Sequence, residues 1–519
     1  MRITYLGHAG FCVETSQATV IMDPWLSPTG AFDAAWFQFP RNHHLRDLIE
    51  ERLRAPGRQH FVYISHEHKD HFDLPLLRSL ESRDFTLVIG RFQRRALQLA
   101  LAEYACNGLR VCEDGEQIPI PGGYLKVYLD DSGLNRDSGI LVAADGHTFL
   151  NLNDCKMYDR LADVVNEEGK IDVFTCQFSG ATWHPTCYTY PQEQYERISR
   201  KKMLGKFESV VQAIKTVNPR IYLPSAGPAC FLDPELLHIN FENVNIFPRS
   251  PKFIDYLNRR LPNTSTSWFD IAPGDVLDVA SGELLSTSDE RVDEEHFREY
   301  LQRYAAEYAE YFEQLRCAPD GTSSEDVLDR LRLALLRKLE RFGLRSRMHS
   351  SLYFGLTDQP DQWLEVDFKA GTVERAAAVS GPRYYSISAP AWQVRRILDG
   401  QITWEDFSLT FRARLERAPD LYQTIVQAFL ILEAEDLDWF CSRLLDLEER
   451  GERTVVEVGG RRYSIARFCP HQGGDLKMGR PGDPGCWVCP RHGWQFDLDN
   501  GGACTTNETT IDAVALEED

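Results

Sequence analysis

Short runs of alternating or continuous apolar residues fill the first half of the chain, and helical spacing separates them. The pattern predicts strands at 3–13, 18–22, 61–65, 86–90, 124–129, 140–144 and 148–152. Helical spacing at 73–82 and 91–106 predicts two helices, and a longer helix is expected from 191 to 216. Strands that alternate with helices up to about residue 280 are typical of an α/β domain with layered sheets.

The second half of the chain has a different pattern. Residues 281–345 are charged and helical in spacing, 350–390 alternate as strands, and 391–446 have helical spacing again. A hairpin is expected over 454–468. These changes predict three regions, which are an α/β domain at 1–280, a helical and α+β middle region at 281–448, and a small all-β domain at 449–519.

Composition narrows the function classes. The chain has 519 residues, 43% of them hydrophobic, and a formal net charge of −21, which argues against nucleic acid and anionic membrane surfaces as partners. No apolar run approaches the ~18–20 residues of a membrane span, and the N-terminus is predicted to be a strand instead of a signal peptide. Thirteen cysteines without an export signal suggest reduced thiols and a cytoplasmic location.

The strongest chemical motif lies near the C-terminus. Cys469-Pro470-His471 is followed, after seventeen residues, by Cys489-Pro490-Arg491-His492. Two thiolates on one iron and two imidazoles on the other are the ligands of a Rieske [2Fe-2S] cluster. Zinc can also occupy a site with two Cys and two His ligands, but the Gly-rich continuation of each pair favours a cluster held by two loops. We therefore expect Cys469, His471, Cys489 and His492 to bind a cluster that transfers single electrons.

A second motif directly follows the strand predicted at 61–65. In His66-Glu67-His68-Lys69-Asp70-His71, two histidines two residues apart can bind one metal, and Asp70 with His71 can bind a second. Because a loop at a strand end can direct several side chains to one point, these four residues are predicted to form a catalytic metal centre.

This loop and the order of elements around it resemble the metallo-β-lactamase superfamily. The resemblance implies an αββα sandwich, with Asp23 bracing the metal loop and Asp154 bridging two metals. Superfamily members normally have two further histidine ligands, near 130–138 and near 224–227, and neither stretch contains a histidine here. Candidate replacements are Asp131, Asp137 and His184.

A site richer in oxygen ligands suits non-haem iron, which activates O₂. Further stretches resemble the CMP-N-acetylneuraminate hydroxylase family, among them Asn151–Cys155, Phe178–Ala181, Asn218–Pro224 and Ile402–Phe407. In that family the Rieske domain precedes the metallo-β-lactamase-like domain, whereas here it follows. The resemblance implies an O₂-dependent monooxygenase, with one or two irons in the first site, acting on a small molecule such as an N-acyl or amino compound or a sugar nucleotide. An external reductase of the ferredoxin, cytochrome b5 or flavin reductase type would supply electrons to the [2Fe-2S] cluster.

Two other hypotheses fit the same motifs. The first is a zinc hydrolase of the metallo-β-lactamase type whose Rieske domain senses redox state. The second is an electron-transfer or scaffold protein whose first metal site is no longer functional. Metal analysis and substitution of the loop histidines distinguish these hypotheses from an iron oxygenase.

Overall fold

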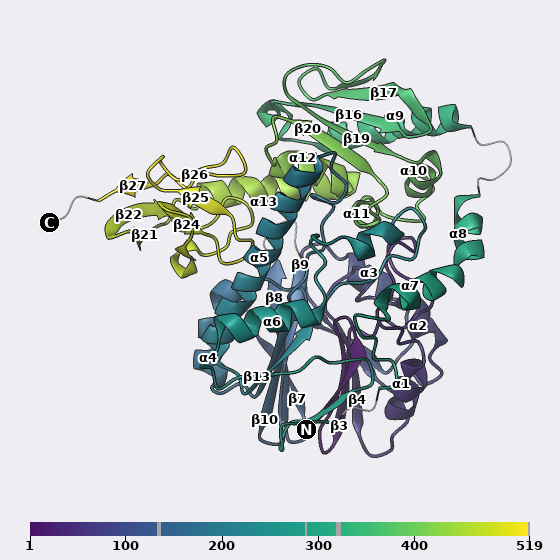
Figure 1. The fold of residues 1–519 in the computed structure, drawn as a ribbon, viewed down its shortest axis with the longest axis vertical. Coiled ribbons are helices and arrows are strands. Elements are labelled where there is room, and N and C mark those ends of the chain that lie inside the picture. Colours follow the sequence, from purple (N-terminus) through teal and green to yellow (C-terminus); the bar gives the residue numbers. More distant parts are fainter. Residues whose placement is uncertain (132–135, 286–287, 318–322, 517–519) are drawn as a thin grey trace.

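The computed structural model describes residues 1–131, 136–285, 288–317 and 323–516. The N-terminal domain forms the lower part of Figure 1, the middle region lies above it, and the C-terminal domain lies at one side. The stretch 130–138, in which a superfamily histidine was expected, is described except for 132–135.

The first sheet of the N-terminal domain has the order β15-β14-β1-β2-β3-β4-β5-β6. Its strands are β1 (Arg2–Gly7), β2 (Gly10–Glu14), β3 (Ala18–Met22), β4 (Gln59–Ile64), β5 (Thr86–Gly90), β6 (Gly108–Cys112), β14 (Val276–Asp278) and β15 (Glu283–Leu285). Strands β3 to β6 are parallel, so their C-terminal ends meet at one edge of the sheet. The metal loop begins at that edge, directly after β4.

The second sheet has the order β13-β12-β11-β10-β9-β8-β7. Its strands are β7 (Glu116–Ile120), β8 (Gly123–Asp131), β9 (Arg136–Ala144), β10 (His147–Asn151), β11 (Val173–Gln177), β12 (Ile221–Ser225) and β13 (Ser267–Trp268). Strands β10 to β13 are parallel, and the C-terminal end of β10 leads to Asp154.

Three hydrophobic cores make the domain a four-layered αββα sandwich. The central core joins the inner faces of the two sheets. A second core packs α1 (Leu45–Leu53), α2 (Leu74–Ser79) and α3 (Ala96–Leu101) on the first sheet. A third packs α4 (Leu161–Glu168), α5 (Gln192–Val217) and α6 (Ser250–Arg260) on the second sheet. The helix predicted at 191–216 is α5, whereas the helices expected at 73–82 and 91–106 are shorter.

The run 3–13, predicted as one strand, is two antiparallel strands joined by a tight turn. Gly7 has φ of 102° and His8 has φ of 51°, and the Leu6 carbonyl accepts a hydrogen bond of 2.7 Å from Asn42 Nδ2. Apolar residues lie on both sides of the turn, so alternation alone conceals it. The turn places His8 at the same edge of the sheet as the metal loop.

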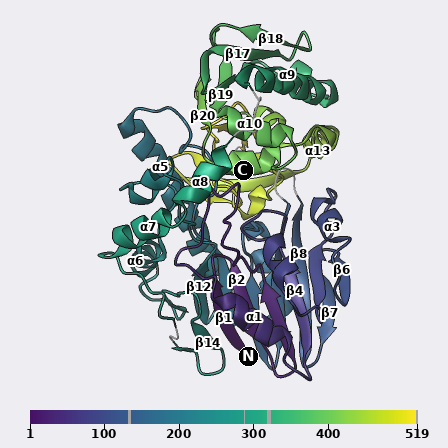
Figure 2. The ribbon, with the colours of Figure 1, turned by 90° about the vertical axis from the view of Figure 1, so that its right-hand side faces the viewer.

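The middle region is built on a sheet of order β18-β17-β16-β19-β20. Its elements are β16 (Ser351–Leu356), β17 (Gln359–Asp367), β18 (Thr372–Ala376), β19 (Tyr384–Ala389), β20 (Arg414–Ala418), α7 (Phe297–Ala306), α8 (Ala309–Arg316), α9 (Ser324–Arg341), α10 (Ala391–Leu398), α11 (Trp404–Leu409), α12 (Thr424–Ile431) and α13 (Leu437–Glu449). Its core includes Trp25, Trp36 and Phe231 of the first domain, so the two regions share one hydrophobic cluster. Figure 2 shows this sheet above the N-terminal sandwich.

The C-terminal domain consists of two small antiparallel sheets. One has the order β21-β22-β27, and the other has the order β23-β24-β25-β26. The strands are β21 (Arg453–Val458), β22 (Arg461–Ala466), β23 (Arg480–Pro481), β24 (Cys486–Val488), β25 (Gln495–Asp497), β26 (Ala503–Cys504) and β27 (Val514–Ala515). Across the described ranges, no helix is both long and apolar enough to cross a membrane.

Candidate metal centre

The loop 66–71 is buried at the C-terminal edge of the first sheet. Its residues His66, Asp70 and His71 are 2%, 4% and 0% exposed. Two of these side chains and the neighbouring Asp154 form one group of possible ligands, with His66, His71 and Asp154 offering atoms that all lie within 4.8 Å of one another. His71 Nε2 lies 3.7 Å from Asp154 Oδ1. The structure thus brings Asp154, from the second sheet, to the loop that follows the first sheet.

A second group on the other side of His71 contains a residue that the sequence analysis did not select. His8, Asp70 and His71 also offer ligand atoms within 4.8 Å of one another. His8 Nε2 lies 2.9 Å from Asp70 Oδ2, and His8 Nδ1 lies 2.9 Å from the Gly227 carbonyl oxygen. His8 therefore places a nitrogen next to the stretch 224–227, where a histidine was expected and none occurs. Its flanking glycines at a strand end were the available signal.

Asp23 holds the metal loop from behind. Its Oδ1 accepts a hydrogen bond of 2.8 Å from the Ser65 backbone N–H. Its Oδ2 lies 2.8 Å from His71 Nδ1 and leaves Nε2 directed at the two groups of possible ligands. Asp23 is fully buried, and its φ of 40° marks a strained strand end. A carboxylate on the outer nitrogen of a histidine fixes the tautomer that a metal ligand needs.

Three possible ligand atoms at this site are buried and lack hydrogen-bond partners among the described residues. They are Asp70 Oδ1, His71 Nε2 and Asp154 Oδ1. Buried polar atoms are otherwise nearly always paired. Burial lowers the pKa of His66, whereas Asp70 and Asp154 outweigh burial at His71 and raise its pKa to about 10. The two sites therefore fit divalent metal ions, which would satisfy the carboxylates and replace the proton on His71.

The outer side of the loop contacts the middle region through Glu405 at the first turn of α11. Glu405 Oε1 lies 3.4 Å from His68 Nε2, and its Oε2 accepts a hydrogen bond of 2.9 Å from Arg136 Nη2. Arg136 is paired with Glu67 as well. His68 Nδ1 lies 2.9 Å from His66 Nε2, which places His68 beside the first group. The side chain of His68 is 28% exposed, so the centre is accessible on this side.

The three replacement ligands suggested by the sequence lie in different places. Asp137 Oδ1 lies 3.5 Å from His66 Nδ1, beside the metal loop. Asp131 instead accepts a hydrogen bond of 2.8 Å from the Gln93 backbone N–H. His184 lies 3.1 Å from the Tyr190 hydroxyl and belongs to neither group of possible ligands found in the described residues. Of the three, only Asp137 is brought to the centre.

The cluster motif occupies two loops of the same geometry. In the first loop, the Gly473 N–H donates to the Cys469 carbonyl at 2.8 Å, and in the second the Gly493 N–H donates to the Cys489 carbonyl at 3.0 Å. Both glycines have left-handed φ values, 67° and 70°, which explains the choice of glycine. Cys469 and Cys489 are 2% and 1% exposed.

The cluster ligands converge between these loops. The rings of His471 and His492 are 4.7 Å apart, and His471 stacks on Trp494 at 4.0 Å. Burial lowers the pKa of His471 to about 3, so it is neutral, as a metal ligand must be. His471 Nδ1 is buried without a partner in the described part of the chain, and a Cβ on Gly474 would lie 3.1 Å from Cys489 Sγ. These observations fit a [2Fe-2S] cluster between the loops.

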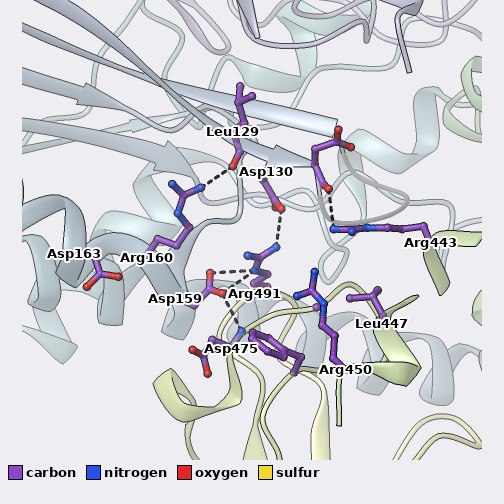
Figure 3. A pocket seen from close by; sticks show the side chains of 13 residues that line it. Leu129, Asp130, Asp159, Arg160, Asp163, Arg443, Leu447, Arg450, Asp475 and Arg491 are labelled. Atoms are coloured by element: carbon purple, nitrogen blue, oxygen red, sulfur yellow. Dashed lines mark hydrogen bonds and ion pairs between the residues drawn. The ribbon is translucent and has the colours of Figure 1, made fainter. Parts of the chain in front are cut away.

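Arg491 of the second cluster loop joins the C-terminal domain to the N-terminal domain. Its Nη1 donates a hydrogen bond of 2.6 Å to Asp130 Oδ1, and its Nε donates to both carboxylate oxygens of Asp159 at 3.0 Å. Figure 3 shows this guanidinium between the two carboxylates, in the wall of a cavity of about 310 Å³. Asp159 also accepts a hydrogen bond of 2.9 Å from the Asp475 backbone N–H. The cluster loops are therefore fixed against the first domain.

Lys156, two residues after Asp154, is near enough to both sites for its charge to act on their histidines. Burial is the largest cause of the lowered pKa of His66 in the metal loop, and the neighbouring histidines come next. The charge of Lys156 lowers this pKa further. Lys156 also lowers the pKa of His492, where burial and His471 have larger effects. It lowers the pKa of His471 as well, where only burial has a larger effect. One side chain thus acts electrostatically on both candidate sites.

Two family models match parts of the chain. Residues 2–226 match the β-lactamase superfamily domain, and residues 430–514 match the Rieske [2Fe-2S] domain. The N-terminal domain therefore has the metallo-β-lactamase fold, and the C-terminal domain is a Rieske domain that carries a [2Fe-2S] cluster.

Two relatives align with most of this chain, and a solved structure aligns with about half of it. The chain is 29% identical to a protein of Mycolicibacterium smegmatis named as a Rieske 2Fe-2S iron-sulfur protein, over 98% of both chains. It is 23% identical to the cytidine monophosphate-N-acetylneuraminic acid hydroxylase of Mus musculus, over 81% of this chain and 72% of the hydroxylase. A solved structure of CmlA, a diiron β-hydroxylase from Streptomyces venezuelae, matches with 17% identity and a TM-score of 0.33, over 52% of each chain.

Proposed function

We propose that this protein is a hydroxylase-type oxidoreductase in which the Rieske cluster supplies electrons to iron bound by the N-terminal domain. The observation that carries the proposal is that Arg491 and the Asp475 N–H fix the cluster loops to Asp130 and Asp159 of the domain that contains the metal loop. A fixed arrangement of the two sites in one chain favours electron transfer between them.

The proposed reaction is a monooxygenation that uses O₂ and an external electron donor. A substrate C–H bond becomes C–OH, the second oxygen atom leaves as water, and two electrons and two protons are consumed. Bound iron would supply the activation of O₂, and the cluster would supply the electrons singly. His8, His66, Asp70, His71 and Asp154 are the proposed iron ligands, with His68 and Asp137 beside them. Asp23 keeps His71 oriented, and Glu405 orients His68.

The substrate proposed is a small molecule, such as an N-acyl or amino compound or a sugar nucleotide. The name of the hydroxylase relatives indicates a nucleotide-linked N-acetylated sugar acid for those proteins. The external donor would be a ferredoxin, cytochrome b5 or flavin reductase type of protein.

A zinc hydrolase with a redox-sensing Rieske domain is the second candidate, and His8 is the observation that favours it. In the group His8, Asp70 and His71, His8 supplies a nitrogen ligand. The lack of two superfamily histidines in the sequence had argued against zinc, and His8 weakens that argument. Both iron and zinc accept histidine and carboxylate ligands. The identity of the bound metal therefore decides between the two candidates.

The proposed function is tested by measuring O₂ uptake with a reductase and candidate substrates. The variants are Cys489→Ser, which removes a cluster ligand, and His66→Ala, which removes a first-site ligand. Matched controls are the exposed Cys317→Ser and His147→Ala, whose Nδ1 lies 3.5 Å from Asp172. We expect both site variants to lose product formation and both controls to keep it. Turnover that survives Cys489→Ser would contradict an electron supply through the cluster.

A further inference from the structure

The long helix α5 presents Lys202 and Lys206 on one face, four residues apart. The sequence alone suggests that its basic residues form a solvated helix face. Lys201 and Lys215 behave in this way, since both are exposed and the nearest acidic contact of Lys201 is Asp483 at 3.7 Å. Lys202 and Lys206 differ, because each donates a hydrogen bond to another part of the chain, Lys202 to the His184 carbonyl oxygen and Lys206 to Gln177 Oε1.

Lys202 extends from α5 towards β20 of the middle region. Its Nζ donates a hydrogen bond of 2.9 Å to the His184 carbonyl oxygen. His184 Nε2 in turn lies 3.3 Å from Arg417 Nη2. Lys202 is solvent-accessible, so a soluble ligand can reach it. His184 therefore brings together two cations from different regions of the chain.

Arg417 has donor capacity that the protein itself does not use. Its side chain is 6% exposed, and its Nε donates a hydrogen bond of 2.8 Å to Asp420 Oδ1. The Tyr188 ring lies 4.9 Å from the guanidinium carbon. Its Nη1 is buried and has no hydrogen-bond partner among the described residues. An unpartnered guanidinium N–H group in a buried position indicates a ligand that accepts hydrogen bonds.

Lys206 extends this cationic surface towards the metal centre. Its Nζ donates to Gln177 Oε1 at 2.9 Å and lies 3.5 Å from the Tyr158 hydroxyl. Burial, with a smaller effect of the neighbouring Lys156, lowers its pKa to about 7, although the Asp154 charge acts in the opposite direction. Lys206 also contributes, after larger effects, to the lowered pKa of His492.

Three lysines of this region lack a close carboxylate partner. Among the described residues, no ion pair within 4.0 Å involves Lys156, Lys202 or Lys206, whereas Arg417 is paired with Asp420. Many of the molecule's other cations are paired with acids, and the formal net charge is −21. Cations that lie close together without carboxylate partners lower one another's pKa, and an anion bound beside them would stabilise their charged forms.

We propose that Lys202, Lys206 and Arg417 form a binding site for an oxyanion, a phosphate or carboxylate group, on the substrate. Lys206, on which the charges of Lys156 and Asp154 act, would be the part of the site nearest the metal centre. The assignment of the ligand as substrate rests on the proposed function, but the binding of an oxyanion does not. Arg417 can bind two oxygens through its fork, while the lysines act as mobile point charges.

The test measures binding of inorganic phosphate and, separately, of succinate to the full-length protein by calorimetry at constant ionic strength. The site variant is Lys202→Gln/Lys206→Gln, and the matched control on the same helix is Lys201→Gln/Lys215→Gln. Glutamine keeps a helix propensity close to that of lysine, so α5 is retained in both. A second variant, Arg417→Gln, tests the contribution of the middle region.

We expect wild type and the control to bind at least one probe, and the site variant to bind it about tenfold more weakly or worse. Binding of phosphate alone would assign a phosphorylated ligand, and binding of succinate alone would assign a carboxylate ligand. Equal affinities in the two double variants, or no binding of either probe to wild type, would overturn the inference. His66→Ala/His71→Ala should still bind the probe, so a failure of the iron site is distinguished from a failure of the oxyanion site.

Discussion

Replacing Arg491 by Gln removes the cation that fixes the second cluster loop to the N-terminal domain. The ion pairs are buried, since the side chains of Arg491, Asp130 and Asp159 are 9%, 1% and 3% exposed. The substitution leaves two carboxylates of the N-terminal domain at the interface without the counter-charge that Arg491 supplies. Undocking of the C-terminal domain would allow water to reach both carboxylates, so the cost is expected in docking more than in the folding of either domain.

Removing one partner of a buried ion pair costs about 3–5 kcal/mol. At about 1.36 kcal/mol for each factor of ten, this energy shifts the docking equilibrium by roughly a hundredfold to a few thousandfold. The exposed Arg461 is a matched control in the same domain, because its side chain is 75% exposed and lies 3.7 Å from Asp499. Arg461→Gln should change docking by less than about 0.5 kcal/mol.

Amide hydrogen exchange measured by mass spectrometry reports docking directly. Peptides that contain Asp159 and the Asp475 N–H, which donates to it, should exchange faster in Arg491→Gln by up to the factor given above. The [2Fe-2S] signal in electron paramagnetic resonance should persist, because no cluster ligand is changed. Replacing all three charges together, as Arg491→Met/Asp130→Asn/Asp159→Asn, should restore much of the protection, since no unpaired charge remains. Unchanged exchange in Arg491→Gln would refute the view that this ion pair holds the domains together.

Three further predictions concern the metal centre and the middle region. His8→Ala should lower the metal content of the first domain, whereas His184→Ala should not. Metal analysis of the purified variants measures this, and equal metal contents in the two variants would contradict the role of His8. Asp23→Ala should weaken metal binding about 10–100-fold, because His71 would lose the carboxylate that orients it. Competition with a chelator measures the affinity, and an unchanged affinity would exclude an orienting role for Asp23. Burial lowers the pKa of Lys338 from 10.5 to about 7 in the folded protein. Between about pH 7 and 10.5 the unfolded chain therefore binds one more proton than the folded chain. The free energy of unfolding of wild type, relative to that of Lys338→Met, should rise with pH in that window. Denaturant titrations at two pH values measure this difference, which a flat profile would contradict.

The sequence allowed the two metal motifs to be located because the residues of each motif lie close together in the chain. His66–His71 follows a recognisable strand, and the four cluster residues lie in two Gly-rich loops. An α/β domain with layered sheets could also be predicted, since apolar runs mark the strands and helical spacing marks α5, whereas the αββα order came from the superfamily resemblance. Asp23 and Asp154 were found through the superfamily resemblance and their positions at strand ends.

His8 was not selected because apolar residues on both sides of its turn continue the strand pattern, and Gly7 and Gly10 were the available signal of a turn. Leu6, Ala9 and Phe11 continue the apolar pattern through the turn, and the left-handed φ of His8 is sustained by its bonds to Asp70 and Gly227. Glu405 and Arg491 are a different case. Glu405 contacts Arg136 and His68, and Arg491 contacts Asp159 and Asp130. The residues of each pair are 269 or more positions apart, and a single sequence contains no information on such pairs.

The central claim, that the first domain binds iron beside the Rieske cluster, is tested most directly by Mössbauer spectroscopy of ⁵⁷Fe-enriched protein with parallel metal analysis. The account predicts the two irons of the cluster and, in addition, one or two irons per chain with a separate spectrum. The additional iron should be lost in His66→Ala/His71→Ala, while the cluster spectrum remains. Zinc in the first domain, with all of the iron accounted for by the cluster, would contradict the claim and favour the hydrolase.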